Sequence, residues 1–325
     1  MIFARFLLLP ALFAAVAARA AVEVKSLDDR VRIEIDGKLF TEYHIAGAPH
    51  VYYWPVIGPG GVKMTRSWPM AEVPGEERDH VHHRSLWFSH GQVNGVDFWG
   101  EAASYKGTPK HPVGRIEHDK IVEAKGGADS GLLKASQKWI ASDESIPLTS
   151  TQTLKVYSRP DTERVFDFEV TLTASDKDVV LGDTKEGTAA IRIAESMRLK
   201  GPKTTPGAGK ILNSEGDADG KVWGKRAKWV DMSGPIDGKI FGIAFMDHPK
   251  NPRHPTRWHA RDYGLFAANP FCEKDMDKNQ PQGAGDFTLK AGQSITFRYR
   301  LLIHEGDAAA AKVADRYQAF TQGKL

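Results

Sequence analysis

Cysteine is almost absent from this chain. Among its 325 residues the only thiol is that of Cys272, so no internal disulfide can form and the core must be stable without one. We expect Cys272 to be a half-buried structural thiol rather than a nucleophile. Long apolar runs are also missing after residue 20, because no later stretch approaches the ~18 apolar residues that a spanning helix needs. We therefore predict no integral membrane segment in the mature chain.

An excess of one charge is missing as well. The chain has 44 lysines and arginines against 41 aspartates and glutamates, which gives a formal net charge of +3. This balance offers no argument for nucleic acid or an anionic membrane as a partner. We therefore expect neither, and the search for a ligand turns to small molecules.

The N-terminus has the pattern of an export signal. Arg5 lies ahead of the apolar run 6–16, and Ala18-Arg19-Ala20 is a small-x-small cleavage site. We predict that residues 1–20 form a signal peptide cut after Ala20, with an uncleaved N-terminal anchor as the alternative. The mature protein is then periplasmic or secreted.

Alternating apolar and polar residues dominate the rest of the chain. In residues 164–173, Phe166, Phe168, Val170 and Leu172 are separated by polar residues, and a period of two is typical of a strand with one buried face. We predict further strands at residues 31–35, 38–45, 114–124, 132–141, 150–157, 189–199, 240–245 and 294–304.

Helical patterns are scarce. One amphipathic segment, residues 308–322, follows Asp307 as its predicted N-cap and ends at Gly323. Long antiparallel strands without helical crossovers indicate two packed sheets. We predict an all-β fold, a large antiparallel β-sandwich with a short C-terminal helix, which forms a single domain over residues 21–325.

Histidines gather in one short segment. Four of the chain's 12 histidines lie within eleven residues, and His80, His82 and His83 are the densest part. Imidazole can bind a metal, or donate or accept a proton near neutral pH. If the segment is extended, His80 and His82 project to one side and His83 to the other. Arg84 and Trp87 follow directly, and they offer a charged group and an apolar platform for a ligand such as a sugar ring.

A metal at this segment is the alternative to proton transfer. His80 and His82 would need a third ligand, such as Glu101 or a later histidine. The chain has no His-Glu-x-x-His pair and no cysteine pair, so the sequence contains no zinc motif of that kind. We therefore predict no metal and no cofactor. The structural alternative is that these imidazoles cap turns or bond to backbone carbonyls.

A second polar cluster precedes the predicted strand 189–199. Glu186 lies beside Gly187 at the strand entrance, where a carboxylate can act as a base or a nucleophile. Lys185 next to it would keep that carboxylate ionised. The structural alternative is a charged surface turn.

A third cluster is a loop rich in proline, arginine and histidine. It contains Arg253, Trp258, His259 and Arg261, and Asn269 follows shortly after. Proline lowers the entropy of holding polar groups in place, and arginine offers a planar fork for carboxylate, sulfate or hydroxyl groups. We predict that this loop lines the site, with His259 catalytic and the other four in contact with substrate. The alternative is a basic surface loop, and Asn269 could equally cap a turn.

Six strings spread over nearly the whole mature chain form a distinctive set: Tyr53-Trp54-Pro55-Val56-Ile57-Gly58-Pro59, Thr65-Arg66-Ser67-Trp68-Pro69, Asp79-His80-Val81-His82-His83-Arg84-Ser85-Leu86-Trp87, Val96-Asp97-Phe98-Trp99, Thr184-Lys185-Glu186-Gly187 and Trp258-His259-Ala260-Arg261-Asp262-Tyr263-Gly264. With them the chain resembles the PmoA-like bacterial family, a domain of unknown function that has carried the label "methane oxygenase". The resemblance implies an exported protein associated with sugar catabolism and an architecture similar to the galactose-mutarotase-like β supersandwich. The family's motif positions carry over to His80, His82, His83, Arg84, Glu186, His259 and Arg261.

These observations favour an exported carbohydrate-active enzyme of the glycoside hydrolase, lyase or epimerase type. Its substrate would be a small molecule or an oligosaccharide in a concave sheet face. We expect Glu186 to act as the base, His80 or His82 as the acid, and His259 as a further catalytic group. Substrate contacts are expected from His83, Arg84, Trp87, Arg253, Trp258, Arg261 and Asn269. The alternatives are a sugar-binding protein without catalysis and a metal-dependent oxygenase or hydrolase that uses His80 and His82.

Overall fold

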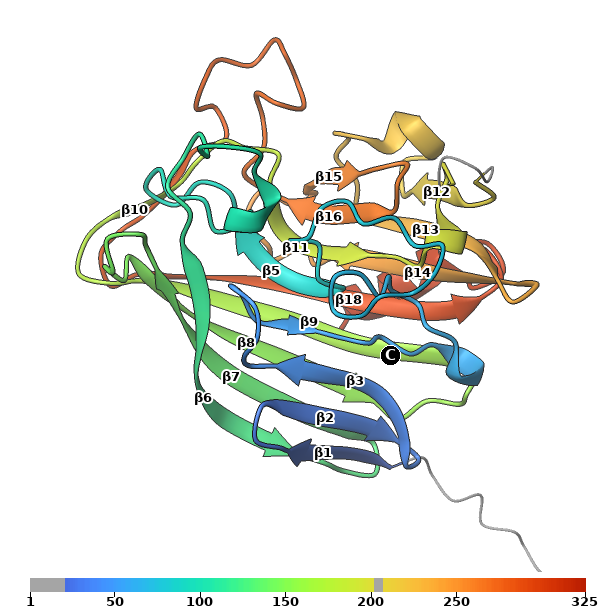
Figure 1. The fold of residues 1–325 in the computed structure, drawn as a ribbon. Helices are drawn as coiled ribbons and strands as arrows, with labels where there is room; N and C mark the ends of the chain where they lie inside the picture. The colour runs from blue at the N-terminus through green and yellow to red at the C-terminus, as the bar shows by residue number, and fades with distance from the viewer. Residues whose placement is uncertain (1–20, 202–206) are drawn as a thin grey trace, which may run out of the picture.

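The computed structural model describes residues 21–201 and 207–325. Two eight-stranded antiparallel sheets make up the sandwich (Figure 1). The first sheet contains, in spatial order, β1 (Val22–Ser26), β2 (Arg30–Ile35), β3 (Lys38–His44), β4 (Tyr52–Tyr53), β5 (Leu86–His90), β11 (Gly187–Arg192), β16 (Leu265–Asn269) and β15 (Arg257–Ala260). The predicted signal peptide lies outside the described residues.

The second sheet has the longer strands. It contains, in spatial order, β12 (Lys210–Asn213), β13 (Trp229–Ile236), β14 (Lys239–Asp247), β18 (Ser294–Glu305), β9 (Glu163–Ala174), β8 (Leu148–Tyr157), β7 (Ser130–Ile140) and β6 (Arg115–Lys125). A small ribbon pairs β10 (Val179–Leu181) with β17 (Phe287–Leu289). Four short 3-10 turns connect strands: η1 (Pro59–Gly61), η2 (Ala102–Ser104), η3 (Glu195–Met197) and η4 (Asp219–Val222).

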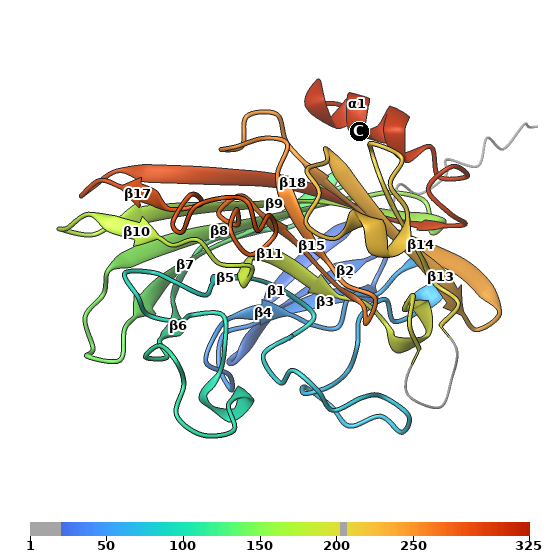
Figure 2. The same cartoon turned by 90° about the horizontal axis from the view of Figure 1, so that it is seen from above.

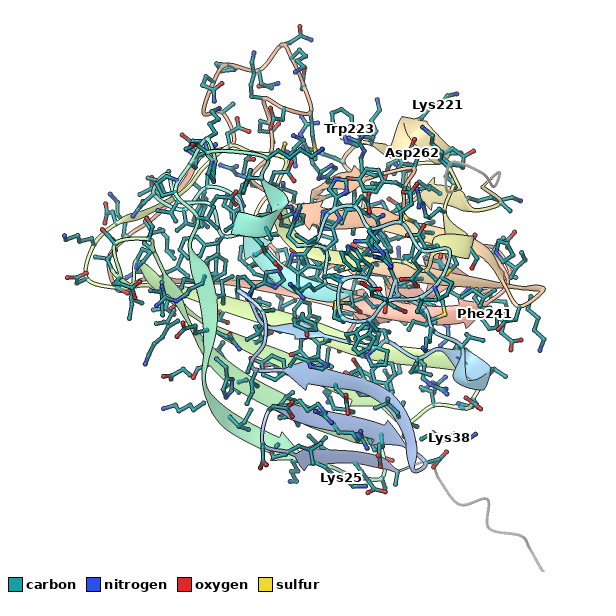
Figure 3. All side chains as sticks on the ribbon, viewed as in Figure 1. Lys25, Lys38, Lys221, Trp223, Phe241 and Asp262 are labelled. Carbon is teal, nitrogen blue, oxygen red and sulfur yellow. The ribbon has the colours of Figure 1, made fainter. Side chains whose placement is uncertain are left out.

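The main hydrophobic core lies between the two sheets. In β9 the predicted alternation is confirmed, since Phe166, Phe168, Val170 and Leu172 are all buried in this core. Polar side chains take the opposite direction, and Lys25 and Lys38 point outward at the edge of the first sheet (Figure 3). Strands of period two with one buried face are therefore what hold the sandwich together.

The only α-helix among the described residues, α1 (Val313–Thr321), packs on the outer face of the second sheet (Figure 2). The predicted start at residue 308 is wrong. Asp307 accepts a hydrogen bond from the backbone N–H of Ala310 at 3.0 Å, so it caps a turn. Lys312 then adopts a left-handed conformation with φ of 52° and separates that turn from the helix. The all-β sandwich with a short C-terminal helix is otherwise confirmed.

Two further expectations fail locally. The predicted strand 189–199 ends at Arg192 and is followed by the turn η3, because Arg192 and Arg198 leave the strand pattern to contact acidic side chains. Cys272 is fully buried rather than half-buried. Burial raises the pKa of its thiol to about 12, so a nucleophilic thiolate is disfavoured there.

No described helix is long and apolar enough to span a membrane.

Candidate active site

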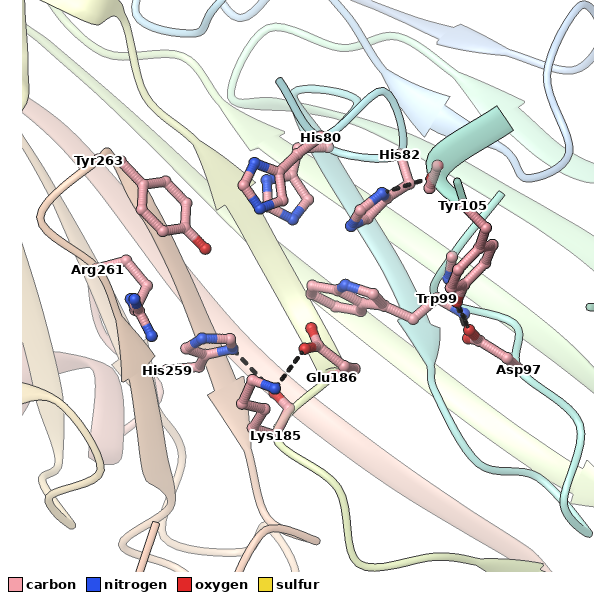
Figure 4. A pocket seen from close by; sticks show the side chains of 13 residues that line it. His80, His82, Asp97, Trp99, Tyr105, Lys185, Glu186, His259, Arg261 and Tyr263 are labelled. Carbon is pink, nitrogen blue, oxygen red and sulfur yellow. Dashed lines mark hydrogen bonds and ion pairs between the residues drawn. The ribbon is translucent and has the colours of Figure 1, made fainter. Parts of the chain in front are cut away.

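A cavity of about 450 Å³ opens on the outer face of the first sheet, away from the main core. Four segments far apart in the sequence line it: residues 80–83, 97–105, 185–186 and 259–263. Figure 4 shows their side chains converging around one space. The histidine segment, Glu186 and His259, which the sequence places in three separate clusters, thus meet at one place.

A row of residues in register across four strands lies on the sheet face that carries this cavity, and His259 at one end of the row lines the cavity. Trp87 of β5 pairs with Ala190 of β11, Ala190 with Ala267 of β16, and Ala267 with His259 of β15. Side chains at paired positions share one face of a sheet. Trp87, Ala190 and Ala267 belong with Trp99 to a small buried apolar cluster on this face, behind the cavity lining.

Glu186 stands at the entrance of β11 beside Lys185. A carboxylate oxygen of Glu186 lies 3.0 Å from the Lys185 ammonium, and both side chains remain about a third exposed. The backbone carbonyl of Glu186 accepts the N–H of Gly91 at 2.7 Å. At Gly187 a Cβ would lie 2.5 Å from the His90 ring, so only glycine allows this close approach. The backbone around Glu186 is therefore tightly held while its carboxylate reaches the cavity.

His259 presents a bare ring nitrogen. Its Nδ1 lies 2.9 Å from the carbonyl oxygen of Lys185, and a carbonyl only accepts, so Nδ1 carries the proton. Nε2 is buried and has no hydrogen-bond partner among the described residues. Burial, together with the charges of Arg261 and Lys185, lowers the pKa of His259 to about 3. The imidazole is therefore neutral, with a free acceptor lone pair at the cavity wall.

The histidine segment is a turn, so the extended arrangement considered for it, with His80 and His82 on one side and His83 on the other, does not apply. His83 donates its backbone N–H to the carbonyl of His80 at 3.0 Å, and His80 has a φ of 42°. The turn brings His80 onto His83, with ring centroids 4.6 Å apart and nearly parallel. His80 also stacks on Tyr263 at 5.1 Å. The side of the cavity opposite Glu186 is thus a cluster of flat rings (Figure 4).

His83 is neutral in the opposite tautomer to His259. Arg192 donates from Nη1 to His83 Nδ1 at 3.3 Å, so the proton of His83 sits on Nε2. Burial lowers the pKa of His83 well below its usual range. Burial also lowers the pKa of His82 to about 3, while Nδ1 of His82 bonds to the Ser104 hydroxyl at 2.8 Å. His82 is therefore not an imidazolium acid near neutral pH, which corrects that part of its expected role.

A buried charge network supports the ring cluster from behind. Arg66 and Arg192 are both fully buried and both bond to the Asp79 carboxylate. His80 donates from Nδ1 to the same carboxylate at 2.6 Å. Burial acts to raise the pKa of Asp79, but the His80 hydrogen bond and the two arginines overcome it and hold the pKa well below its usual range. Asp79 is thus an ionised anchor for three side chains.

We expect Asp79→Asn to lower the free energy of unfolding by about 3 kcal/mol at pH 7, because two buried guanidinium groups lose their shared counterion. A depressed folded pKa stabilises the fold above the unfolded value of about 4, and this contribution is lost as pH falls below it. Urea unfolding at pH 7 measures the change, with the exposed Asp28→Asn as control. A loss below about 1 kcal/mol would mean that the network is not stabilising.

The remaining wall carries Asp97, Trp99 and Tyr105. Asp97 accepts the Tyr105 hydroxyl and the backbone N–H groups of Trp99 and Gly100, the latter two at 2.8 and 2.9 Å. Its carboxylate is thus engaged by three donors. The indole N–H of Trp99 is buried and has no partner in the described part of the chain. This wall offers a ring edge and a donor to a ligand.

Several expected substrate contacts are placed elsewhere. Trp258 faces the main core, where its indole N–H donates to the Ala227 carbonyl at 2.8 Å. Trp87 lies fully buried beneath the cavity, stacked 5.4 Å from His83. Its ring therefore supports the site from below, and neither indole is available as a platform for a ligand.

Three polar residues are likewise committed to the fold. Arg253 donates to the backbone carbonyls of Pro270, Gly285 and Asp286. Arg84 forms a two-pronged pair with Glu101 at 2.6 and 2.8 Å. Asn269 is buried and donates to the Thr184 carbonyl at 2.9 Å. Each satisfies buried groups that would otherwise lack partners, so the expectation that they bind substrate is not supported.

Sequence reasoning also missed residues that line the cavity. Among them are Asp97, Trp99, Tyr105 and Tyr263. Trp99 and Tyr263 belong to strings that carry the family resemblance, so that signal marks them, but neither was assigned a role. Burial raises the pKa of Tyr263 to about 12. Its phenol therefore keeps its proton at neutral pH, and in Figure 4 the hydroxyl points into the cavity.

Metal ligation was the alternative for His80 and His82. Their ring planes are 69° apart, with centroids separated by 5.6 Å. Within residues 21–201 and 207–325, no group of three or more histidine, cysteine, aspartate or glutamate side chains is arranged to hold a metal ion. Glu101, considered as a third ligand, pairs with Arg84 instead. The geometry therefore gives this alternative no support.

Fold and site together define an antiparallel β-sandwich protein with a cavity lined by histidines and a carboxylate on one sheet face. Residues 30–318 match the model of a family described as a family of unknown function, DUF6807, and the chain belongs to that family. No curated protein matches the chain. The family description names no activity, so the resemblance to PmoA-like proteins remains a prediction.

A solved structure with some likeness is the crystal structure of the GalM/aldose epimerase homologue from C. elegans. It shares 6% sequence identity with this chain, with a TM-score of 0.32, and the match covers 89% of this chain and 99% of that one. A likeness at this level carries no argument about the function of the present protein.

Proposed function

We propose that this protein is an exported enzyme that acts on a carbohydrate by acid–base proton transfer. One observation carries the proposal: the Glu186 carboxylate, paired with Lys185, a neutral histidine with an unpartnered ring nitrogen and a protonated phenol all line one cavity. General acid–base catalysis requires a proton acceptor and a proton donor in the same cleft. The N-terminal signal pattern supports export.

The cavity suits a sugar in size and character. Its volume of about 450 Å³ falls within the range of ~300–1,000 Å³ typical of small-molecule sites. Trp99, Tyr105 and Tyr263 supply ring surfaces, while Lys185 and Arg261 supply donors for hydroxyl groups. A sugar, with an apolar ring face and polar edges, matches this mixture.

The carboxylates favour proton abstraction from carbon over glycoside hydrolysis. Hydrolysis of a glycosidic bond commonly uses two carboxyl groups, one as acid and one as base or nucleophile. Glu186 and Asp97 are the two carboxylates among the described residues of the lining, and Asp97 is engaged by three donors. A single partly exposed carboxylate, Glu186, opposite a phenol fits an epimerase or a lyase better.

In this proposal Glu186 takes the proton from a carbon of the sugar, and Lys185 pairs with its carboxylate at 3.0 Å. Tyr263 on the opposite side donates its proton, either to the same carbon from the other face or to a departing oxygen. His80, hydrogen bonded to Asp79, stacks on Tyr263 and fixes the ring. His259 lies beside Glu186 and accepts a hydroxyl hydrogen through Nε2.

Proton abstraction is expected to leave a trace even when the product is unknown. Incubation in D₂O with a panel of hexoses, uronates and short glycosides should show loss of a C–H signal in the proton NMR spectrum of at least one sugar. Release of reducing ends without such exchange would indicate hydrolysis. A sugar that binds without C–H exchange and without release of reducing ends would contradict the enzymatic function and indicate a sugar-binding protein.

A further inference from the structure

Arg261 is singular among the arginines of the described residues 21–201 and 207–325. Every other one has a hydrogen bond or an ion pair, as Arg84 does with Glu101 and Arg257 with Glu273. The Arg261 guanidinium has neither, and it lies over the face of the Tyr263 ring, 5.3 Å from the ring centroid. It is half-buried at the cavity wall. A half-buried guanidinium that has no acceptor within the protein can bind an anionic group of a ligand in the cavity.

Arg261 carries the positive charge without a counterion on its side of the cavity. Lys185 pairs with Glu186 at 3.0 Å, and Arg192, whose guanidinium lies 4.7 Å from the centroid of the Tyr263 ring, pairs with Asp79 at 3.1 Å. Asp97, the second carboxylate of the lining, belongs to the other wall and is engaged by three donors. The burial-driven fall in the pKa of His259 is deepened by the Arg261 and Lys185 charges. A carboxylate is therefore the fitting occupant.

We propose that the substrate is a sugar acid, a uronate, whose carboxylate is held by Arg261 with the adjacent C–H turned toward Glu186. This rests on the proposed acid–base function. Arg261 follows directly after the end of β15, two residues beyond His259, and both side chains line the cavity. In this arrangement His259 Nε2 accepts a hydroxyl hydrogen near the carboxylate. The rings of His80 and Tyr263, which lie across the cavity from Glu186 (Figure 4), would cover the other side of the sugar.

The chemistry of a uronate makes use of both groups. Pairing of the carboxylate with a guanidinium acidifies the neighbouring C–H, because the charge that develops on the carboxylate during proton removal is stabilised. Glu186 takes that proton, and the C–H electron pair moves into the carboxylate. The pair then returns either to form a new C–H bond with the Tyr263 proton, or to form C=C as the C–O bond one carbon further breaks. In the second case the departing oxygen takes the Tyr263 proton.

The test is binding, measured by isothermal titration calorimetry in buffer with 0.15 M NaCl. The probes are D-glucuronate, D-galacturonate and di-galacturonate, with D-glucose and D-galactose as neutral partners and glucose 6-sulfate as a different anion. All binding measurements use the Glu186→Gln variant, so that turnover of the probes does not interfere. We expect at least one uronate to bind at least tenfold more tightly than its neutral partner, and more tightly than the sulfate.

Arg261→Gln should remove that preference, with a loss of roughly 10- to 100-fold in uronate affinity and little change for the neutral sugar. Arg261→Lys should recover part of it, because charge returns without the fork. Arg298→Gln, on the second sheet, is the control and should change nothing. Equal binding of uronate and hexose, a preference that survives Arg261→Gln, or tighter binding of the sulfate would each overturn the inference.

The proposed function fails in a different way. Exchange of a hexose C–H in D₂O without any preference for uronate would support the proposed acid–base enzyme and contradict the proposal that its substrate is a uronate. Arg261-dependent uronate binding without C–H exchange leaves Arg261 as a carboxylate-binding residue and removes the acid–base enzyme. Circular dichroism of each variant separates both results from misfolding.

Discussion

Replacing Glu186 by glutamine is expected to slow C–H exchange on the substrate by about a thousandfold, within the usual contribution of a positioned general base. Glutamine has the same shape but cannot accept a proton from carbon. The backbone of residue 186 is held by Gly91 and by the close packing of Gly187 on His90, neither of which involves the carboxylate. The fold is therefore expected to survive the change.

The measurement is the rate of deuterium incorporation into the sugar that the wild-type protein exchanges. Glu123→Gln, an exposed position on β6, is the matched control and should retain the full rate. Circular dichroism and the thermal midpoint of both variants check the fold. If Glu186→Gln keeps more than about a tenth of the wild-type rate, Glu186 is not the base, and Nε2 of His259 becomes the candidate to replace next.

The alternation of apolar and polar residues predicts the sandwich. The same alternation also bears on which residues of β15 can reach the cavity. Neighbouring residues of a strand point to opposite faces, so Trp258 and His259 cannot both reach one cavity. The structure places Trp258 in the core and His259 at the cavity. Had the strand at this position been recognised, the alternation itself would have excluded Trp258.

The histidine segment shows where local sequence is insufficient. Residues 79–84 contain no glycine or proline that would signal a turn, so an extended backbone was one interpretation of this segment. The turn forms because Asp79 is drawn to two buried arginines, of which Arg192 lies more than a hundred residues away. The resulting stack of His80 on His83 is a consequence of long-range charge pairing. Such pairing has no signature in a single sequence.

The arginines illustrate the same limit. Residue type alone predicts that Arg84, Arg253 and Arg261 can each bind an anion. Only the fold shows that Glu101 and a set of backbone carbonyls already satisfy the first two. The sequence therefore predicts which classes of side chain are candidates for a binding site, while the choice of the unpaired arginine required the tertiary structure.

Acid is expected to unfold this protein steeply, because several histidines are buried in the neutral form. Burial lowers the pKa of His82 and His259 to about 3 and that of His90 to about 4, and lowers that of His83 well below its usual range. In the unfolded chain these groups titrate near 6.5. Below that pH these histidines are protonated in the unfolded state but remain neutral in the folded state. The stabilisation is therefore complete above pH ~6.5 and is lost progressively as pH falls toward the folded values.

The expected size of the effect follows from the proton count. Each proton taken up on unfolding contributes about 1.4 kcal/mol per pH unit, so four histidines give roughly 5 kcal/mol per unit near pH 5. A typical domain has only about 5–15 kcal/mol in total. Urea unfolding at pH 8, 7, 6 and 5 measures the slope. His259→Gln should reduce it by about one proton, whereas the uncharged, exposed Gln322→Ala should not. A free energy of unfolding that stays flat from pH 7 to 5 would mean that these imidazoles are protonated within the fold, and the bare acceptor at His259 Nε2 would be lost with them.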